Sequence, residues 1–164
     1  MNKAVFLDRD GVINFNRNYI SRIRDLKYKK EIFSLLRHCV KKGYLLIIIT
    51  NQSGVGRGII SKKDLEKIHR YILAVFRREK IDINRIYYCP SYDNDNYFRK
   101  PNPGMLLKAR RRFNISMKDS ILIGDSMRDI VAGKRAGVGR NILLKENITP
   151  DYCVSTLANI KGLL

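Results

Sequence analysis

The sequence lacks the uninterrupted apolar run of roughly eighteen residues that a membrane-spanning helix requires. It reaches Asp8 after only a few apolar residues, so no signal peptide is expected. Cysteine is scarce: Cys39, Cys89 and Cys153 are odd in number, widely spaced, and form neither a C-x-x-C pair nor a disulfide rhythm. Because this cysteine usage suits a reducing compartment, we expect a cytoplasmic protein without membrane association.

Acidic residues are also scarce, with 15 of them against 33 lysines and arginines, which leaves a formal net charge of +18. Such a charge is compatible with nucleic acid or anionic surfaces, and equally with a protein that handles a phosphorylated small molecule. The basic residues occur in short clusters, with no long basic arm and no aromatic–basic RNA-binding signature. We therefore do not expect nucleic acid to be the main partner.

The familiar phosphate-binding glycine motifs are absent. Gly54, Gly56 and Gly58 match neither the dinucleotide fingerprint nor the G-x-x-x-x-G-K-[ST] loop. This segment is compatible with a nest of backbone amides for an anion and equally with a plain flexible turn. Histidine offers no alternative metal site, because His38 and His69 have no clustered partner and are expected to be structural or solvated.

What the sequence does contain is a regular alternation of apolar runs and amphipathic segments, without an internal repeat or linker. Its 164 residues, 45% of them hydrophobic, are enough for one domain, residues 1–164, with a sizeable core. Continuous apolar runs predict strands at 4–7, 44–49, 83–88, 120–124, 141–144 and, as a short sixth strand, 152–154. Apolar residues at three–four spacing, capping residues and turn residues predict helices at 32–40, 61–76, 103–113, 126–136 and 155–164. The alternation predicts an α/β fold with a doubly wound, mostly parallel sheet.

Two carboxylates, Asp8 and Asp10, follow the first predicted strand and precede Gly11, which lets the backbone turn sharply. Burying like charges side by side is unfavourable unless a cation or a pKa shift relieves the repulsion. A simple surface Asp-Gly turn is the alternative. An EF-hand calcium loop is excluded, because Gly11 stands at position four instead of six and Tyr19 occupies position twelve. The segment is the first indication of a metal site.

Polar residues follow two further predicted strands, and a basic pair precedes a predicted helix. Because the carboxyl ends of parallel strands lie at one edge of a sheet, these clusters should converge there with Asp8 and Asp10. They are Thr50 with Asn51, Asp125 with Asp129, and Arg99 with Lys100. Carboxylates suit a hard cation such as Mg²⁺, while a hydroxyl, an amide and a lysine suit phosphoryl oxygens. The sequence predicts a magnesium-dependent phosphoryl-transfer centre.

These motifs, in this order, resemble the four motifs of the haloacid dehalogenase superfamily of phosphatases. They are Asp8-x-Asp10-Gly-Val, Thr50-Asn51, Lys100 and Gly124-Asp125-Ser-x-x-Asp129. The segments 50–58 (TNQSGVGRG) and 99–105 (RKPNPGM) resemble the branch that contains heptose-1,7-bisphosphate 7-phosphatases and histidinol-phosphate phosphatases. The resemblance covers residues 4 to about 137. It implies a Rossmann-like fold, and no insertion here is long enough for a separate cap domain; loops 15–27, 53–60 and 88–98 would rim an open site.

The resemblance implies roles for the acidic residues. Asp8 would attack phosphorus and form an aspartyl-phosphate, while Asp10 would act as the general acid and base. Mg²⁺ would bind the Asp8 carboxylate, the Asp10 backbone carbonyl and Asp125. Asp129 would orient Lys100 or a metal-bound water; a solvated helix carboxylate is the alternative.

The resemblance also implies the binding residues. Thr50 and Asn51 would hold phosphoryl oxygens, and Lys100 would neutralise charge on Asp8 and the transferring group. Arg99 would contact substrate phosphate. Because an open site suits a substrate whose second phosphate supplies binding energy, we expect Arg57, Arg99 or the arginines and lysines of loop 15–27 to hold a second phosphate.

One feature of that branch is missing. Relatives often carry a structural zinc bound by Cys-x-His and Cys-x-Cys ahead of the Arg-Lys-Pro segment. Here Cys89 remains, but Ser91, Asn96 and Phe98 occupy the other three positions. Because one thiolate does not make a tetrahedral zinc site, we expect no zinc. Aromatic side chains such as Tyr97 would pack this loop instead.

The expected function is a magnesium-dependent phosphatase for a small phosphorylated sugar, acting on the 7-phosphate of D-glycero-D-manno-heptose 1,7-bisphosphate and as a monomer. Histidinol phosphate is an alternative substrate. A polynucleotide 3′-phosphatase is a second alternative, favoured only by the basic charge. A phosphate-binding regulatory module is the non-enzymatic alternative, although such a protein would be expected to have lost Asp8 or Asp10.

Overall fold

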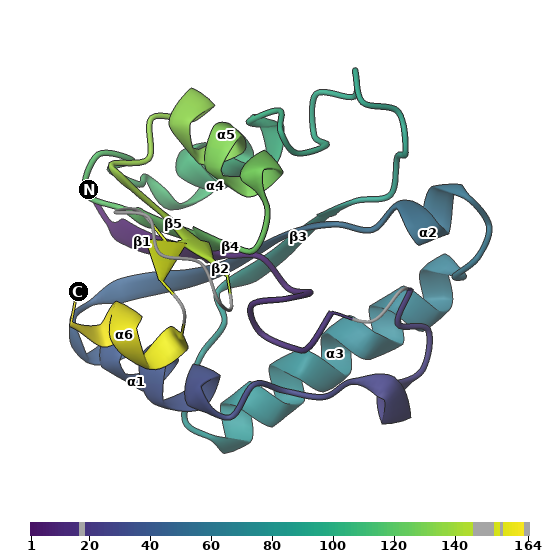
Figure 1. Ribbon diagram of the computed structural model, residues 1–164, viewed down its shortest axis with the longest axis horizontal. Coiled ribbons are helices and arrows are strands. Elements are labelled where there is room, and N and C mark those ends of the chain that lie inside the picture. Colours follow the sequence, from purple (N-terminus) through teal and green to yellow (C-terminus); the bar gives the residue numbers. More distant parts are fainter. Residues whose placement is uncertain (17–18, 146–152, 155, 163–164) are drawn as a thin grey trace.

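Six parallel strands form one sheet in the order β3-β2-β1-β4-β5-β6 (Figure 1). This computed structural model describes residues 1–16, 19–145, 153–154 and 156–162. The strands are β1 (Lys3–Leu7), β2 (Tyr44–Asn51), β3 (Arg85–Cys89), β4 (Ile121–Gly124), β5 (Arg140–Leu144) and β6 (Cys153–Val154). The predicted parallel α/β sheet is confirmed. Tyr152, which we expected at the start of the last strand, lies outside the described residues.

Helices cover both faces of the sheet, as the doubly wound prediction requires. They are η1 (Ile23–Asp25, a 3₁₀ helix), α1 (Glu31–Lys41), α2 (Ser53–Gly56), α3 (Lys62–Arg78), α4 (Gly104–Phe113), α5 (Met127–Arg135) and α6 (Leu157–Lys161). Figure 1 shows α4 and α5 on one side of the sheet and α1, α3 and α6 on the other. The glycine segment 53–58, left open between an amide nest and a turn, forms the short helix α2.

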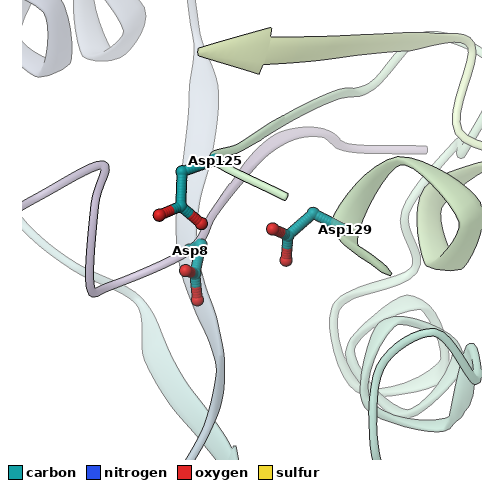
Figure 2. Close-up of side chains that lie close together, drawn as sticks. All are labelled: Asp8, Asp125 and Asp129. Carbon is teal, nitrogen blue, oxygen red and sulfur yellow. The ribbon is translucent and has the colours of Figure 1, made fainter. Parts of the chain in front are cut away.

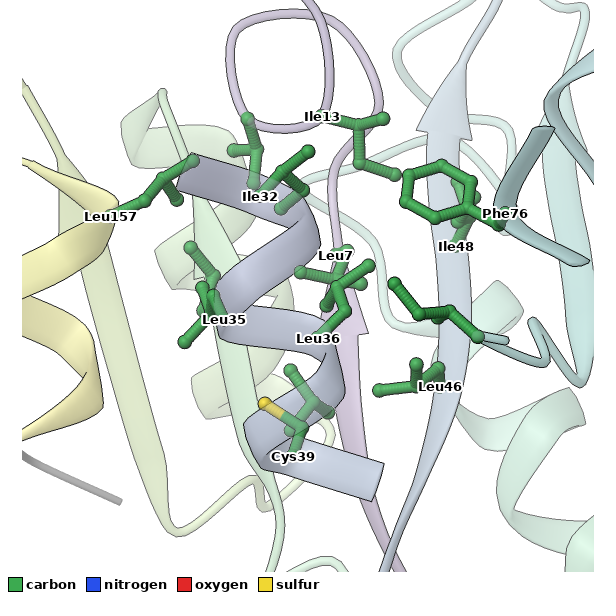
Figure 3. Packing of buried hydrophobic residues seen from close by; sticks show 14 of the residues in the cluster. Leu7, Ile13, Ile32, Leu35, Leu36, Cys39, Leu46, Ile48, Phe76 and Leu157 are labelled. Carbon is green, nitrogen blue, oxygen red and sulfur yellow. The ribbon is translucent and has the colours of Figure 1, made fainter. Parts of the chain in front are cut away.

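The core has two layers, because successive side chains of a strand point to opposite faces. From β1, Val5 and Leu7 join the cluster beneath α1, α3 and α6, whereas Ala4 and Phe6 join the cluster beneath α4 and α5. All four side chains are fully buried. Figure 3 shows the first layer, in which side chains of α1 pack against β1 and β2. A strand covered on both faces is apolar throughout, and this explains the continuous run that predicted β1.

The central strands end together at the edge that carries the polar clusters. Because β1 pairs in parallel with both β2 and β4, Asp8, Thr50 and Asp125 reach the same edge. Gly11 makes the turn after β1 with a φ of +93°, and a Cβ at this position would overlap the Asp125 carboxylate. Gly124 similarly leaves room for Asp129. Two glycines therefore let acidic side chains from distant segments approach one another.

The connections between these elements contain little regular structure. Residues 8–30, between β1 and α1, contain the 3₁₀ helix η1, and residues 90–103 join β3 to α4. Neither connection holds a second domain among the described residues. In the described part of the chain, every helix is too short or too polar to cross a membrane.

Candidate active site

Three aspartates from two distant segments of the chain meet at the carboxyl edge of the sheet. Asp8 follows β1, Asp125 follows β4, and Asp129 lies in the first turn of α5. One carboxylate oxygen of each lies within 4.8 Å of the others, and Figure 2 shows the three side chains gathered in one place. The structure thus brings together side chains that are separated by more than one hundred residues in the sequence.

Lys100 lies against this acidic cluster and is only 4% exposed. Its Nζ donates to Asp8 Oδ1 at 2.8 Å and to the Ile49 carbonyl at 2.8 Å, and it lies 2.5 Å from Asp129 Oδ1. Burial alone would lower the pKa of Lys100, but the charges and hydrogen bonds of Asp8 and Asp129 outweigh burial and raise it. Lys100 is therefore a permanent cation that bridges two of the three carboxylates.

One lysine does not balance three clustered carboxylates, of which Asp129 is buried and the other two are half-buried. Burial raises the pKa of Asp8 to about 8, with Asp129, Asp125 and Asp10 adding to the rise and Lys100 opposing it. Burial, with the charge of Asp129, also raises the pKa of Asp125. Such a cluster favours a divalent cation, and an all-carboxylate oxygen donor set suits Mg²⁺. The residues present therefore fit a magnesium ion.

The oxygens of Asp129 already have partners. Oδ1 contacts Lys100, while Oδ2 accepts hydrogen bonds from the Ser126 backbone amide at 3.1 Å and from Ser126 Oγ at 2.8 Å. With Ser126 as N-cap, these contacts form the capping box of α5. Asp129 thus ties Lys100 to the start of α5, which leaves Asp8 and Asp125 as the better metal ligands.

Asn51 contacts the main chain of Lys100 in both directions. Its Nδ2 donates to the Lys100 carbonyl and its Oδ1 accepts from the Lys100 amide, both at 3.0 Å. A reciprocal pair of this kind holds an extended segment as a neighbouring strand would. From the sequence we expected Asn51 to bind substrate; the structure adds a second use for its amide, the positioning of Lys100.

Asp10 is surrounded by hydrogen-bond donors. Arg9 contacts both carboxylate oxygens, through Nε at 3.1 Å and Nη2 at 2.7 Å; Asn14 Nδ2 and Gln52 Nε2 each donate at 2.9 Å. Burial raises the pKa of Asp10, but the charge and hydrogen bonds of Arg9, with those of Asn14 and Gln52, outweigh it and hold the pKa below its usual value. These donors therefore favour the carboxylate form of Asp10.

Sequence reasoning missed this group of donors. Arg9 is only 1% exposed, and besides Asp10 it contacts Gln52 Oε1 at 3.1 Å and His69 Nε2 at 3.4 Å. Gln52 in turn donates to Thr50 Oγ1 at 2.9 Å. An arginine between two aspartates carries no periodicity that indicates burial. Only the known spacing of the Asp8-x-Asp10 motif could have drawn attention to it.

His69 is structural, as expected, and is held neutral. Its ring is 8% exposed and packs edge-on against Tyr88. Because a guanidinium only donates, His69 Nε2 accepts from Arg9. Burial first, and then the charge of Arg9, lowers the pKa of His69 from 6.5 to about 3, against an opposing effect of Asp10.

This shift predicts a pH-dependent contribution to stability. The pKa of His69 is lower in the folded than in the unfolded chain, so its contribution is complete above pH 6.5 and falls as the pH drops toward about 3. Between pH 7 and pH 5 we expect wild type to lose up to about 2 kcal/mol of unfolding free energy relative to His69→Gln. Urea denaturation at both pH values measures this difference. His38→Gln, outside the Arg9 group, is the matched control, and a pH-independent difference for His69→Gln would contradict the prediction.

A cavity of about 630 Å³ opens over the acidic cluster. Its volume is in the range of small-molecule sites, ~300–1,000 Å³. Of the residues expected from the sequence, it is lined by Asp8, Asp10, Thr50, Asn51, Arg99, Lys100, Asp125 and Asp129. The lining also includes Asn16, Tyr19, Ser53 and Gly54, from two of the loops expected to rim the site. Lining residues that were not expected are Arg9, Gln52, Ser126 and Arg128.

The two predicted arginines differ in position. Arg99 lines the cavity, is 7% exposed, and donates to the Ser91 carbonyl at 2.8 Å and to Asn94 Oδ1 at 3.3 Å. Arg57 is exposed, is not among the lining residues, and places its guanidinium 5.0 Å from the centre of the Tyr92 ring. Arg99 is therefore placed to meet a ligand in the cavity, and Arg57 is placed at the outer surface.

Hydrogen bonds connect positions in the loop where the family resemblance led us to look for zinc ligands. The Cys89 thiol lies 3.6 Å from Asn96 Oδ1, which also accepts from the Phe98 amide at 2.9 Å. Asn102 Nδ2 donates to the carbonyls of Asn94 and Asn96, each at 3.0 Å. The Tyr97 and Phe98 rings pack edge to face. Burial raises the pKa of the Cys89 thiol, so this cysteine favours its neutral form.

Comparison with known proteins places this geometry in a family. A family model described as polynucleotide kinase 3 phosphatase matches residues 6–152. A D-glycero-alpha-D-manno-heptose-1,7-bisphosphate 7-phosphatase of Campylobacter jejuni is 42% identical over 162 residues, covering 99% of this chain and 94% of its own. A D-glycero-beta-D-manno-heptose-1,7-bisphosphate 7-phosphatase of Helicobacter pylori (strain 26695) is 40% identical over 148 residues, which cover 89% of this chain and 86% of the relative.

Solved structures agree with this assignment. The D,D-heptose 1,7-bisphosphate phosphatase of B. bronchiseptica, complexed with magnesium and phosphate, has the same fold, with a TM-score of 0.87 at 24% identity over 98% of this chain and 97% of its own. A HAD-like phosphatase of Mesorhizobium loti is 26% identical, with a TM-score of 0.86; the match covers 98% of this chain and 85% of the other. Fold, motif order and sequence identity together show that this chain belongs to the haloacid dehalogenase superfamily of phosphatases, in the branch of the heptose-1,7-bisphosphate 7-phosphatases.

Proposed function

We propose that the protein is a magnesium-dependent phosphatase that removes the 7-phosphate of a D-glycero-D-manno-heptose 1,7-bisphosphate. The observation that carries the proposal is the acidic cluster bridged by Lys100 at the base of an open polar cavity. Relatives at 42% and 40% identity carry this activity in their names, one for the alpha and one for the beta anomer. The proposal therefore names the reaction and the sugar without choosing an anomer.

Asp8 is the proposed nucleophile. One of its carboxylate oxygens attacks phosphorus and the bond from phosphorus to the sugar oxygen breaks, which leaves an aspartyl-phosphate. Asp10 gives its proton to the departing sugar oxygen. Water then attacks the phosphorus, returns a proton to Asp10 and releases phosphate from Asp8. The donors around Asp10 support the second half of this cycle, since they favour the carboxylate form that accepts a proton.

The remaining residues hold charge and position. Mg²⁺, when bound by Asp8, Asp125 and the Asp10 carbonyl, supplies electrostatic stabilisation of the transferring phosphoryl group. Lys100 adds a fixed positive charge beside the nucleophile. Thr50 offers a buried hydroxyl at the cavity wall.

Positioning residues support Lys100 from two sides. Asn51 holds its backbone, and Asp129 holds its ammonium group while capping α5. We propose positioning as the main role of both residues, with the free lone pairs and N–H of Asn51 available to a phosphoryl oxygen. Arg99 contacts substrate at the rim, and Arg57 acts only outside the cavity.

A polynucleotide 3′-phosphatase is the second candidate. The description of the matching family model and the net charge of +18 favour it. Binding to a nucleic acid backbone would fall steeply with salt, because each phosphate contact releases a counterion. Histidinol phosphate and a non-catalytic phosphate-binding role complete the alternatives. We also propose that the chain acts as a single domain and as a monomer. Its cysteine usage supports a place in the cytoplasm.

A panel of phosphate esters tests the proposal. The substrates are both anomers of heptose 1,7-bisphosphate, fructose 1,6-bisphosphate, histidinol phosphate and a 3′-phosphorylated oligonucleotide, each with Mg²⁺ and with EDTA. We expect one heptose bisphosphate to be preferred in kcat/KM by at least about tenfold, and EDTA to abolish release. Preference for the oligonucleotide would select the second candidate, and release unaffected by EDTA would contradict magnesium dependence.

A further inference from the structure

We propose that Arg128 and Arg99 together form a subsite at the cavity rim for the second phosphate of a bisphosphate substrate. This inference rests on the proposed function and extends it to a residue outside the motifs. From the sequence we expected a second phosphate to bind Arg57, Arg99 or the basic residues of loop 15–27. The structure places Arg57 over Tyr92, outside the cavity lining, and places Arg128 within the lining. Two arginines therefore line one cavity from different segments of the chain.

Helix stability does not explain an arginine at position 128. Arg128 is in the first turn of α5, which begins at Met127 after the N-cap Ser126. The partial positive charge of a helix N-terminus disfavours a cation there, by about 0.3–1 kcal/mol. Ser126 and Asp129 already cap this helix, so it gains nothing from the guanidinium. The exposed side chain instead borders the cavity above the acidic cluster.

The charge of both arginines is left without an acidic partner in the described part of the chain. Arg99 donates only to neutral oxygens, those of Ser91 and Asn94, although it is 7% exposed. Arg128 has no ion pair among the described residues. Asp95 and Arg128 both line an adjoining cavity but form no ion pair with each other. Burial first, and then the charges of Arg128 and Arg57, lower the pKa of Arg99. The effect of Arg128 agrees with its position near Arg99.

A dianionic phosphate is the ligand that this arrangement would recognise. Guanidinium groups present paired N–H donors that match phosphate oxygens. Lys100, the cation at the base, is already engaged by Asp8 and Asp129 and is not free for a second phosphate. A cavity of about 630 Å³ joins the rim to the base, so one molecule that carries two phosphates can reach both positions. The subsite would therefore select sugar bisphosphates over monophosphates.

The test compares substrates that differ only in the second phosphate. kcat and KM are measured for Arg128→Ala and Arg128→Lys with the preferred heptose 1,7-bisphosphate and with heptose 7-phosphate. For Arg128→Ala we expect KM for the bisphosphate to rise about 10- to 100-fold with kcat nearly unchanged, and the kinetics with heptose 7-phosphate to match wild type. The KM of Arg128→Lys for the bisphosphate should lie between those of wild type and Arg128→Ala, because lysine keeps the charge and loses the paired donors. The product heptose 1-phosphate should inhibit Arg128→Ala more weakly by the same factor.

Arg110→Ala is the matched control, since it removes an equal charge from an exposed position of α4 outside the cavity. An equal effect of Arg110→Ala would indicate general attraction by net charge and overturn the subsite. Equal losses on both substrates in Arg128→Ala would place Arg128 at the transferring phosphate, and no loss on either would remove it from binding; both outcomes overturn the proposal. A wild type that hydrolyses no bisphosphate overturns the proposed function together with the subsite, and this is seen before any variant is made.

Discussion

Asp8→Asn is expected to abolish phosphatase turnover, lowering kcat by about 10⁴-fold or more, while the protein stays folded. The amide oxygen can still accept from Lys100, but the uncharged side chain no longer attacks phosphorus. Because the change removes one of three clustered carboxylates, we expect the metal-free variant to be at least as stable as wild type. Phosphate release on the preferred substrate and urea denaturation without metal measure the two effects.

Asp82→Asn makes the same chemical change at an exposed position far from the cluster and should leave both measurements at wild-type values. Residual turnover of Asp8→Asn within tenfold of wild type would require a different nucleophile. A less stable Asp8→Asn would show that the charge of Asp8 stabilises the site. This result would contradict the inference that repulsion among the three carboxylates outweighs the attraction of Lys100.

Lys100→Met should cost both activity and stability. The substitution leaves Asp8 and Asp129 buried without their shared cation and leaves the Ile49 carbonyl without its donor. Breaking a buried ion pair from one side destabilises by about 3–5 kcal/mol. Loss of a fixed charge beside the reacting phosphoryl group should lower kcat/KM by ~10³. We expect Mg²⁺ to recover part of the lost stability, since a bound dication relieves the repulsion between Asp8 and Asp125.

Urea denaturation of Lys100→Met with and without Mg²⁺, together with steady-state kinetics, checks this result. Lys63→Met, at an exposed position of α3, is the control for removing a lysine charge. Wild-type stability of metal-free Lys100→Met would contradict the bridging role. Full activity of this variant would remove Lys100 from the catalytic machinery.

Strand ends and motif residues were predictable because they depend on local patterns. A buried parallel strand is apolar throughout, and the polar residue that follows it marks the carboxyl edge of the sheet. This reasoning brought Asp8 and Asp125 together correctly, as their clustered carboxylates show. The N-cap of α3 is likewise local, because Ser61 Oγ accepts from the Asp64 amide, three positions along the chain, at 3.0 Å.

Side-chain partners were less predictable, because they depend on contacts between distant segments. Arg9 reaches His69, which is sixty positions away, and Asn51 contacts Lys100, which is forty-nine away. No spacing in the sequence encodes these pairs. Arg57 and Arg128 show the same limit: both are exposed arginines in polar segments, and only the folded chain puts Arg128 at the cavity.

The sequence by itself determined the parallel α/β fold and the acidic strand ends, because periodicity and strand-end polarity are properties of neighbouring residues. Only the tertiary structure decided the charged contacts that the sequence did not indicate: Arg9 behind Asp10, and Arg128 with Arg99 at the rim. The physical reason is that a charged side chain is flexible and long, so burial and partner choice follow from what the fold places within its reach.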